Sequence, residues 1–173
     1  MTNPITEAVA DRSSNTLALL EEIVKHESPT NEKSALDQLT RFLQEQISLR
    51  NGAVERLQQD VYGDLLVARW PGNPELRPLF VMTHVDTVWP IGTLQRLPWR
   101  QEDGRQYGPG VFDMKASVAM MLTAIEIIQA LGLARRPIVW MINTEEEVGS
   151  PVSRPVLERL ALEAEYVLCL EPP

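Results

Sequence analysis

The chain has 173 residues, of which 24 are acidic and 16 basic, and its formal net charge is −8. This length corresponds to one ordinary domain, and 44% hydrophobic with 23% charged residues is typical of a globular protein. A single cysteine excludes an internal disulfide framework and a zinc ribbon, and the acidic balance argues against binding to nucleic acid. Because there are only two histidines, any metal site must rely on carboxylates.

The first 15 residues are polar and mixed in charge, and we expect them to form a flexible arm. They lack the apolar core of a signal peptide, and no apolar run approaches the roughly 20 residues that a membrane helix needs. We therefore expect a cytoplasmic protein with no membrane partner.

The region up to residue 70 predicts two helices and a hairpin. Apolar residues recur at helical spacing between residues 17 and 24, and again from about residue 32 to residue 49. Asn51 and Gly52 are typical of the end of the second helix. Residues 58–61 and 65–70 then predict two strands on either side of a short turn.

The rest of the chain alternates between strands and helices. Short apolar runs at residues 79–83, 138–142 and 166–170 are typical of strands buried on both faces. A loop rich in proline and glycine and a helix over about 115–131 separate the first two, and a helix over about 152–162 separates the last two. This order predicts an α/β fold with a mostly parallel, mixed sheet flanked by helices.

Residues suited to metal binding or acid–base chemistry follow the end of each of these three strands. The carboxyl ends of parallel strands meet at one edge of a sheet, so we expect the side chains to lie close together. The candidates are His84 and Asp86 after the first strand, Asp113 before the central helix, Glu145, Glu146 and Glu147 after the second strand, and Glu171 after the third.

Carboxylates crowded into one crevice repel one another unless cations join them. One imidazole with several carboxylates suits zinc, or a harder ion such as manganese or cobalt. Two metals bridged by a carboxylate would fit the charge, and one carboxylate left without a metal could act as general base.

Each candidate also has a simpler interpretation. His84 could be a structural histidine, the three glutamates a solvated loop or helix start, and Asp113 a helix N-cap. Glu171 could simply stand at a chain terminus, and the Gly-Pro-Gly at residues 108–110 lacks the glycine and lysine of a phosphate loop. The coincidence of the candidates at consecutive strand ends favours a functional site.

The sequence around these candidates resembles the co-catalytic zinc metallopeptidase family that contains glutamate carboxypeptidase, aminoacylase, acetylornithine deacetylase, succinyl-diaminopimelate desuccinylase and peptidase T. Four stretches keep the family's order and approximate spacing, and they are nearest to the glutamate carboxypeptidase branch. They are Thr-His-Val-Asp-Thr-Val-Trp-Pro at 83–90, Tyr-Gly-Pro-Gly-Val-Phe-Asp-Met-Lys at 107–115, Asn-Thr-Glu-Glu-Glu-Val-Gly-Ser at 143–150 and Leu-Glu-Pro at 170–172.

The resemblance implies two zinc ions, with cobalt or manganese as possible substitutes. His84 and Glu171 would bind one metal, Glu147 would bind the other, and Asp113 would bridge both. The peptide bond after Asp113 is cis in the family.

The resemblance also implies which residues take part in catalysis. Asp86 would hydrogen-bond the second ring nitrogen of His84, and Glu146 would be the general base. Glu145 would lie outside the metal ligands, at a position where aspartate is common in the branch. Lys115 has no implied role beyond a salt bridge beside the site, and we interpret His26 as structural.

The activity implied is metal-dependent hydrolysis of an amide bond, which releases a C-terminal amino acid from a peptide or N-acyl substrate. An N-acyl amino acid deacylase and a non-catalytic metal-binding domain are the alternatives. Family members also carry a further histidine ligand and an inserted lid that supplies dimer contacts. We therefore expect residues 16–173 to be the N-terminal part of a catalytic domain, weakly active or inactive alone, from a homodimeric parent.

Overall fold

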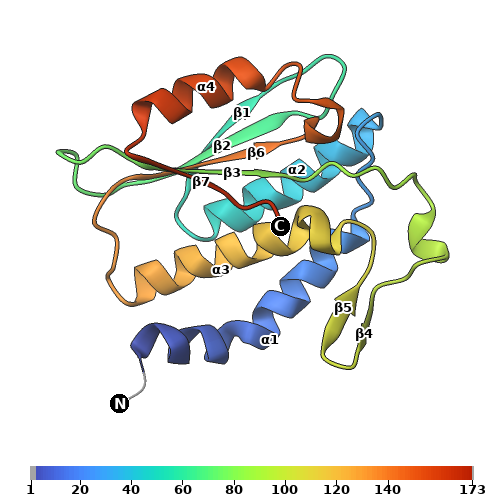
Figure 1. The fold of residues 1–173 in the computed structure, drawn as a ribbon, viewed down its shortest axis with the longest axis horizontal. Helices are drawn as coiled ribbons and strands as arrows, with labels where there is room; N and C mark the ends of the chain where they lie inside the picture. The colour runs from blue at the N-terminus through green and yellow to red at the C-terminus, as the bar shows by residue number, and fades with distance from the viewer. Residues whose placement is uncertain (1–2, 173) are drawn as a thin grey trace.

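The computed structural model describes residues 3–172 and shows a five-stranded sheet between two layers of helices (Figure 1). The sheet order is β1-β2-β6-β3-β7, with antiparallel pairs from β1 to β6 and parallel pairs from β6 to β7. The predicted mixed α/β fold is therefore confirmed. The strands of this sheet are β1 (Ala53–Leu57), β2 (Leu65–Trp70), β3 (Leu79–His84), β6 (Ile138–Asn143) and β7 (Tyr166–Cys169).

The helices cover the two faces of the sheet unequally. One face packs on α4 alone, whereas the other packs on α2 and α3, with α1 beside α3 (Figure 1). None of the helices described within residues 3–172 is long and apolar enough to cross a bilayer. The helices are α1 (Pro4–Lys25), α2 (Lys33–Ser48), α3 (Ala116–Ala130) and α4 (Arg154–Glu163).

Apolar cores on both faces explain why the central strands read as continuous apolar runs. Trp140 of β6 lies in the core beneath α1, α2 and α3, and its neighbour Met141 lies in the core beneath α4. All six residues of β6 are buried. A strand covered on both faces has no solvent side, so its sequence does not alternate.

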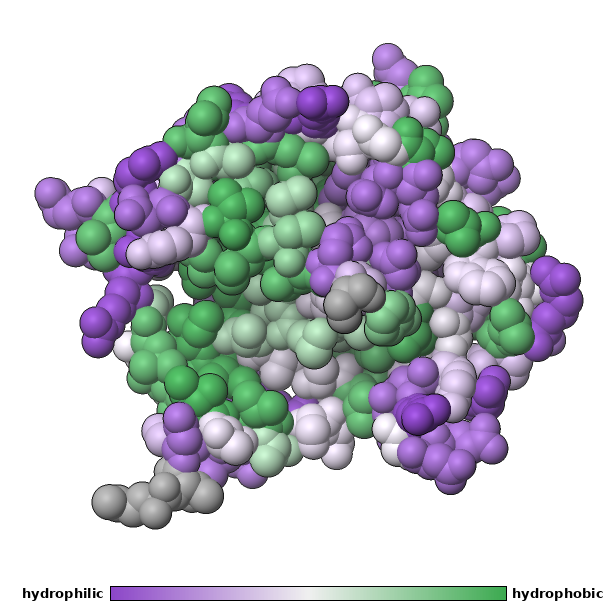
Figure 2. Space-filling model, in the orientation of Figure 1, coloured by the Kyte–Doolittle hydropathy of each residue, from purple (hydrophilic) through white to green (hydrophobic). Residues whose placement is uncertain are grey.

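Strand β7 departs from the prediction that residues 166–170 are buried on both faces. Its four residues are exposed, because β7 is the last strand of the sheet and pairs only with β3 among the described residues. The side chains of Tyr166, Val167 and Leu168 are exposed. Figure 2 shows apolar side chains gathered over the part of the surface where β7 lies in Figure 1.

Two boundaries near the N-terminus also differ from the prediction. Residues 4–15, for which the sequence predicts a flexible arm, are helical, because Pro4 starts α1 and the Asn3 side chain accepts a hydrogen bond from the Ile5 amide at 2.9 Å. Residues 1 and 2 lie outside the described residues. The first strand of the hairpin is β1 at Ala53–Leu57 rather than residues 58–61, which belong to the connection to β2.

The long loop predicted between β3 and α3 contains a small second sheet. Strands β4 (Arg100–Glu102) and β5 (Arg105–Tyr107) form a hairpin around Asp103 and Gly104, both of which have positive φ. An Asp-Gly pair is a recognised signal for a hairpin turn, so this hairpin could have been predicted from the sequence. The described part of the chain also contains three short helical turns: η1 (Thr93–Gln95), η2 (Val111–Lys115) and η3 (Glu146–Val148).

Candidate metal centre

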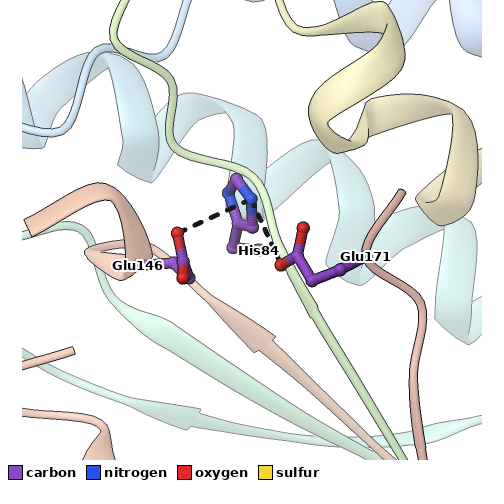
Figure 3. A group of neighbouring side chains, drawn as sticks. All are labelled: His84, Glu146 and Glu171. Carbon is purple, nitrogen blue, oxygen red and sulfur yellow. Dashed lines mark ion pairs between the residues drawn. The ribbon is translucent and has the colours of Figure 1, made fainter. Parts of the chain in front are cut away.

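His84, the last residue of β3, lies at the centre of a group of carboxylates. Its side chain is 1% exposed, and its Nε2 atom lies 2.9 Å from Asp113 Oδ1, 3.5 Å from Glu171 Oε1 and 3.9 Å from Glu146 Oε2. Figure 3 shows Glu146 approaching from the turn after β6, and Glu171 approaching from the segment after β7. The expected convergence of side chains at the strand ends is therefore confirmed.

The side chains form two sets that could hold a metal ion. The ligand atoms of His84, Glu146 and Glu171 all lie within 4.8 Å of one another, and so do those of His84, Asp113 and Glu147. One imidazole nitrogen with carboxylate oxygens is a donor set that suits zinc and similar divalent ions. The geometry thus brings together all four ligands that the sequence predicts, and it also places Glu146, the predicted base, in one of the two sets.

The charges of this group favour a cation. Burial alone would lower the pKa of His84, but the carboxylates of Asp86, Glu171 and Asp113 raise it to about 9. Burial raises the pKa of Glu147 and Glu171, and repulsion from Asp113 and other nearby carboxylates raises it further, while His84 opposes both shifts. These shifts mark an excess of negative charge that a bound cation would offset.

Asp86 is completely buried beneath the centre, and its carboxylate accepts hydrogen bonds from three donors. The main-chain amides of Glu146 and Glu147 donate to it at 3.1 and 3.2 Å, and the hydroxyl of Thr30 donates at 2.8 Å. Thr30 was not found by sequence reasoning, because it follows a helix end and belongs to no periodic pattern.

Asp86 also orients the ring of His84. Its Nδ1 atom lies 3.0 Å from the main-chain oxygen of Asp86 and 3.4 Å from the Asp86 carboxylate. When Nδ1 donates to this oxygen, Nε2 is the nitrogen left free to bind a metal. The nearer partner of Nδ1 is thus the carbonyl of Asp86 rather than the carboxylate that the resemblance implies.

Residues 143–150 form a closed loop that presents Glu146 and Glu147. The Asn143 side chain accepts hydrogen bonds from the Thr144 and Glu145 amides at 2.7 and 3.1 Å, and donates to the Ser150 hydroxyl at 2.8 Å. The three consecutive glutamates are therefore part of an ordered turn rather than a freely solvated loop.

Glu145 points away from the other two glutamates and into the protein. Its carboxylate accepts hydrogen bonds from the Val152 and Ser153 amides at 3.2 and 2.7 Å, just before α4 begins. This buried side chain anchors the far end of the turn, in agreement with a position outside the metal ligands.

Asp113 lies in η2, and the peptide bond between Asp113 and Met114 is cis, as the resemblance implies. The sulfur of Met114 accepts a hydrogen bond from the His84 amide at 3.2 Å, which connects this turn to β3. Asp113 does not cap α3, whose N-cap residue is Lys115 and lacks a side-chain cap. The N-cap interpretation of Asp113 is therefore wrong.

Lys115 and His26 support the loops beside the centre. The buried Lys115 ammonium donates to the main-chain oxygen of His26 at 2.7 Å, and burial lowers the pKa of Lys115 to about 7, with Glu27 opposing the shift. Within residues 3–172 Lys115 forms no ion pair, so the expected salt bridge is not observed. The ring of His26 packs on Phe42, with centroids 5.2 Å apart, which agrees with a structural role.

A comparison with known sequences decides the family. The profile described as peptidase family M20/M25/M40 matches residues 80–173, over half of the chain. The chain belongs to this peptidase family. The matched region includes every carboxylate and the histidine of the centre described above.

Curated relatives of this M20/M25/M40 chain include peptidases and amidohydrolases. Carboxypeptidase G2 of Pseudomonas sp. (strain RS-16) is 31% identical over 173 residues, which cover 98% of this chain and 41% of that protein. Succinyl-diaminopimelate desuccinylase of Janthinobacterium sp. (strain Marseille) is 32% identical over 143 residues, which cover 78% of this chain and 36% of that protein. The chain thus spans about two fifths of the length of the curated relatives it matches.

Solved structures agree on the fold. Human carnosine dipeptidase 1 superposes with a TM-score of 0.81 at 18% identity, covering 96% of this chain and 40% of that one. The M20 family metallo-carboxypeptidase Sso-CP2 of Sulfolobus solfataricus gives a TM-score of 0.75 at 20% identity, covering 90% of this chain and 37% of that one.

Proposed function

We propose that this chain contributes the centre of a metal-dependent hydrolase that cleaves an amide bond and releases a C-terminal amino acid from a peptide or an N-acyl amino acid. The observation that supports this most directly is the convergence of a buried histidine and four carboxylates at adjacent strand ends. The similarity to carboxypeptidase G2 supports the carboxypeptidase assignment.

The donor set fits two zinc ions, with cobalt or manganese as substitutes. His84, Asp113 and Glu171 would hold one ion, and Asp113 with Glu147 would hold the other. A divalent ion at this place supplies Lewis acidity, which polarises a substrate carbonyl and makes a water molecule acidic enough to lose its proton near neutral pH.

Glu146 is the residue we assign as general base. Its side chain is 47% exposed, whereas its main-chain amide is fixed by the buried Asp86 carboxylate. A carboxylate held in this way can accept a proton from the attacking water and then give the same proton to the leaving nitrogen, which restores its starting charge. Glu147, the next residue, is left to bind the metal.

Two alternatives remain part of the proposal. The similarity to succinyl-diaminopimelate desuccinylase favours an N-acyl amino acid deacylase that uses the same groups. A non-catalytic metal-binding domain is the other alternative. The further histidine that the resemblance implies is not among the described residues of the centre, because His26 packs on Phe42 instead. We therefore expect slow turnover by this chain alone. The resemblance implies in addition that the whole protein is a homodimer.

Elemental analysis of the purified chain tests the proposal first. We expect one to two divalent ions per chain, lost on treatment with a chelator and restored by zinc or cobalt. Release of glutamate from an N-acyl glutamate and of the amino acid from its N-succinyl derivative then compares the two activities. Metal binding without hydrolysis of either substrate would support the non-catalytic alternative, and a chain that binds no divalent ion would contradict the proposal.

A further inference from the structure

A short segment far from the centre in sequence lies directly against the strand end that carries His84. Residues 28–30, which we call the clasp, run parallel to residues 85–87 through a bridge between Pro29 and Thr87. The Ser28 hydroxyl donates to the Val85 carbonyl at 2.7 Å, and the Thr87 amide donates to the Ser28 carbonyl at 2.8 Å. The clasp is therefore fixed on the strand end by main-chain and side-chain hydrogen bonds.

The clasp ends in Thr30, whose buried hydroxyl donates to Asp86 Oδ2 at 2.8 Å. The same oxygen accepts the Glu147 amide at 3.2 Å, and the other carboxylate oxygen accepts the Glu146 amide at 3.1 Å. Thr30 is the one side-chain hydroxyl among these three donors, and its bond comes from a segment distant in sequence. Hydrogen bonds to an ionised carboxylate are about twice as strong as neutral ones, so Thr30 helps to fix this carboxylate.

We propose that Thr30 is a positioning residue for the metal centre. Through Asp86, Thr30 fixes both the ring of His84 and the turn that carries Glu146 and Glu147. Asp86 touches the His84 ring and the amides of both glutamates, so a rotation of its carboxylate changes all three contacts together. Thr30 prevents that rotation from a segment that contributes no ligand. The consequence for metal binding rests on the function proposed above, whereas the consequence for the two amides does not.

Removing only the hydroxyl tests this role. Thr30→Val keeps the shape of the side chain and removes the donor, and Thr30→Ser restores the donor. Thr40→Val is the matched control, because Thr40 is also buried and its hydroxyl is also hydrogen-bonded, but it lies in α2 and contacts Asp37 and Arg56 instead. All variants are made in the full chain, and circular dichroism confirms that they fold.

Two measurements are made on each variant. Amide hydrogen exchange of Glu146 and Glu147, followed by NMR in the metal-free chain, reports on the hydrogen bonds to Asp86. Calorimetric titration with zinc reports on the centre. We expect Thr30→Val to speed exchange of both amides about tenfold and to weaken zinc binding about 10- to 100-fold. Thr30→Ser and Thr40→Val should stay within about threefold of the unmodified chain in both measurements.

The outcomes separate this inference from the proposed function. Unchanged exchange in a folded Thr30→Val variant would overturn the positioning role, even if the unmodified chain binds zinc normally. Failure of the unmodified chain to bind zinc would contradict the proposed function, while the exchange rates would still decide the role of Thr30. If Thr30→Val does not fold, Thr30→Ala is judged by the same criteria, since it places no methyl group against the carboxylate.

Discussion

The residues beneath the metal centre and those that line it differ in burial and in hydrogen bonding. The lower layer is at most 1% exposed and takes its hydrogen bonds largely from the main chain, whereas the side chains of the upper layer are between 36% and 51% exposed. The lower layer comprises His84, Asp86 and Glu145, and the upper layer comprises Asp113, Glu146 and Glu171.

This difference distinguishes residues that mainly position the centre from residues that mainly carry its chemistry, and His84, a buried residue with a proposed metal-binding nitrogen, has both roles. Buried polar groups with several main-chain partners are expensive to disturb, so the lower layer fixes the geometry as part of the fold. Exposed carboxylates cost little to replace in the folded protein, so they are free to bind a cation or exchange a proton. Substitutions in the upper layer should therefore change reactivity alone, and those in the lower layer should change reactivity and stability together.

Glu146→Gln should give the largest effect, in the upper layer. The amide cannot accept a proton, so we expect hydrolysis by the whole protein to fall about 10²- to 10⁴-fold, while the metal content and the melting temperature stay unchanged. Steady-state assays, elemental analysis and thermal denaturation measure these quantities. Glu158→Gln, at an exposed position of α4, is the control and should leave all three unaltered.

Loss of metal from Glu146→Gln would reverse the assignment. In that case Glu146 would be a ligand in the set that it forms with His84 and Glu171, and another group would have to be the base.

Asp86→Asn should affect both metal binding and folding, because it alters the lower layer. The asparagine side chain has an NH2 group where Asp86 has an acceptor oxygen. This NH2 group would face one of the three donors that bind the carboxylate, so that hydrogen bond would be lost. We expect zinc affinity to fall about 100-fold and the free energy of unfolding to fall by about 1–3 kcal/mol. Calorimetry and denaturant titration measure the two changes.

Asp64→Asn provides the comparison for Asp86→Asn. Asp64 is also buried, but it pairs with Lys33 and Arg56 away from the centre. This variant should lose stability and keep its zinc affinity. Equal loss of zinc affinity in both variants would show that general destabilisation, rather than positioning, controls binding.

The pH dependence of metal binding tests whether His84, the buried residue that contacts the exposed carboxylates, is a metal ligand. His84 must lose its proton to bind a metal, and its pKa in the metal-free chain is raised to about 9. Apparent zinc affinity should therefore rise about tenfold per pH unit from pH 7 and level off above about pH 9. The raised pKa values of Glu147 and Glu171 should steepen the loss in acid.

Titration against a competing chelator at pH 6, 7, 8 and 9 measures this dependence. An affinity that stays constant between pH 7 and pH 9 would contradict a metal-binding His84 whose pKa is raised to about 9.

Ser117→Ala should give the smallest effect. The Ser117 hydroxyl of α3 donates to the Leu170 carbonyl at 2.7 Å and so supports the segment that carries Glu171. A single neutral hydrogen bond contributes about 0.5–1.5 kcal/mol, so we expect at most a two- to tenfold loss of zinc affinity. Ser48→Ala, whose hydroxyl donates to Gln44 at the end of α2, is the control for calorimetry. A loss as large as that of Asp86→Asn would remove the distinction between the layers.

The helices and strands with a clear hydrophobic pattern, and the polar residues that follow the strands, could be predicted from the order of the amino acids. Residues 79–83 and 138–142 predict β3 and β6 because strands covered on both faces read as continuous apolar runs. The convergence of His84, Glu147 and Glu171 follows, because parallel strands bring their carboxyl ends to the same edge, whereas Asp113 joins them from η2.

The hydrogen-bond partners of those residues, in contrast, could be found only in the folded chain. The hydrogen bond from Thr30 to Asp86 joins positions 56 residues apart, and no local pattern of the chain records such a contact. The exposure of β7 likewise depends on what lies beside it in the sheet, not on its own apolar sequence. The hydrophobic periodicity of a segment reflects only which of its sides is buried. A buried hydrogen bond requires one particular pair of residues, and that pair is brought together only after the chain has folded.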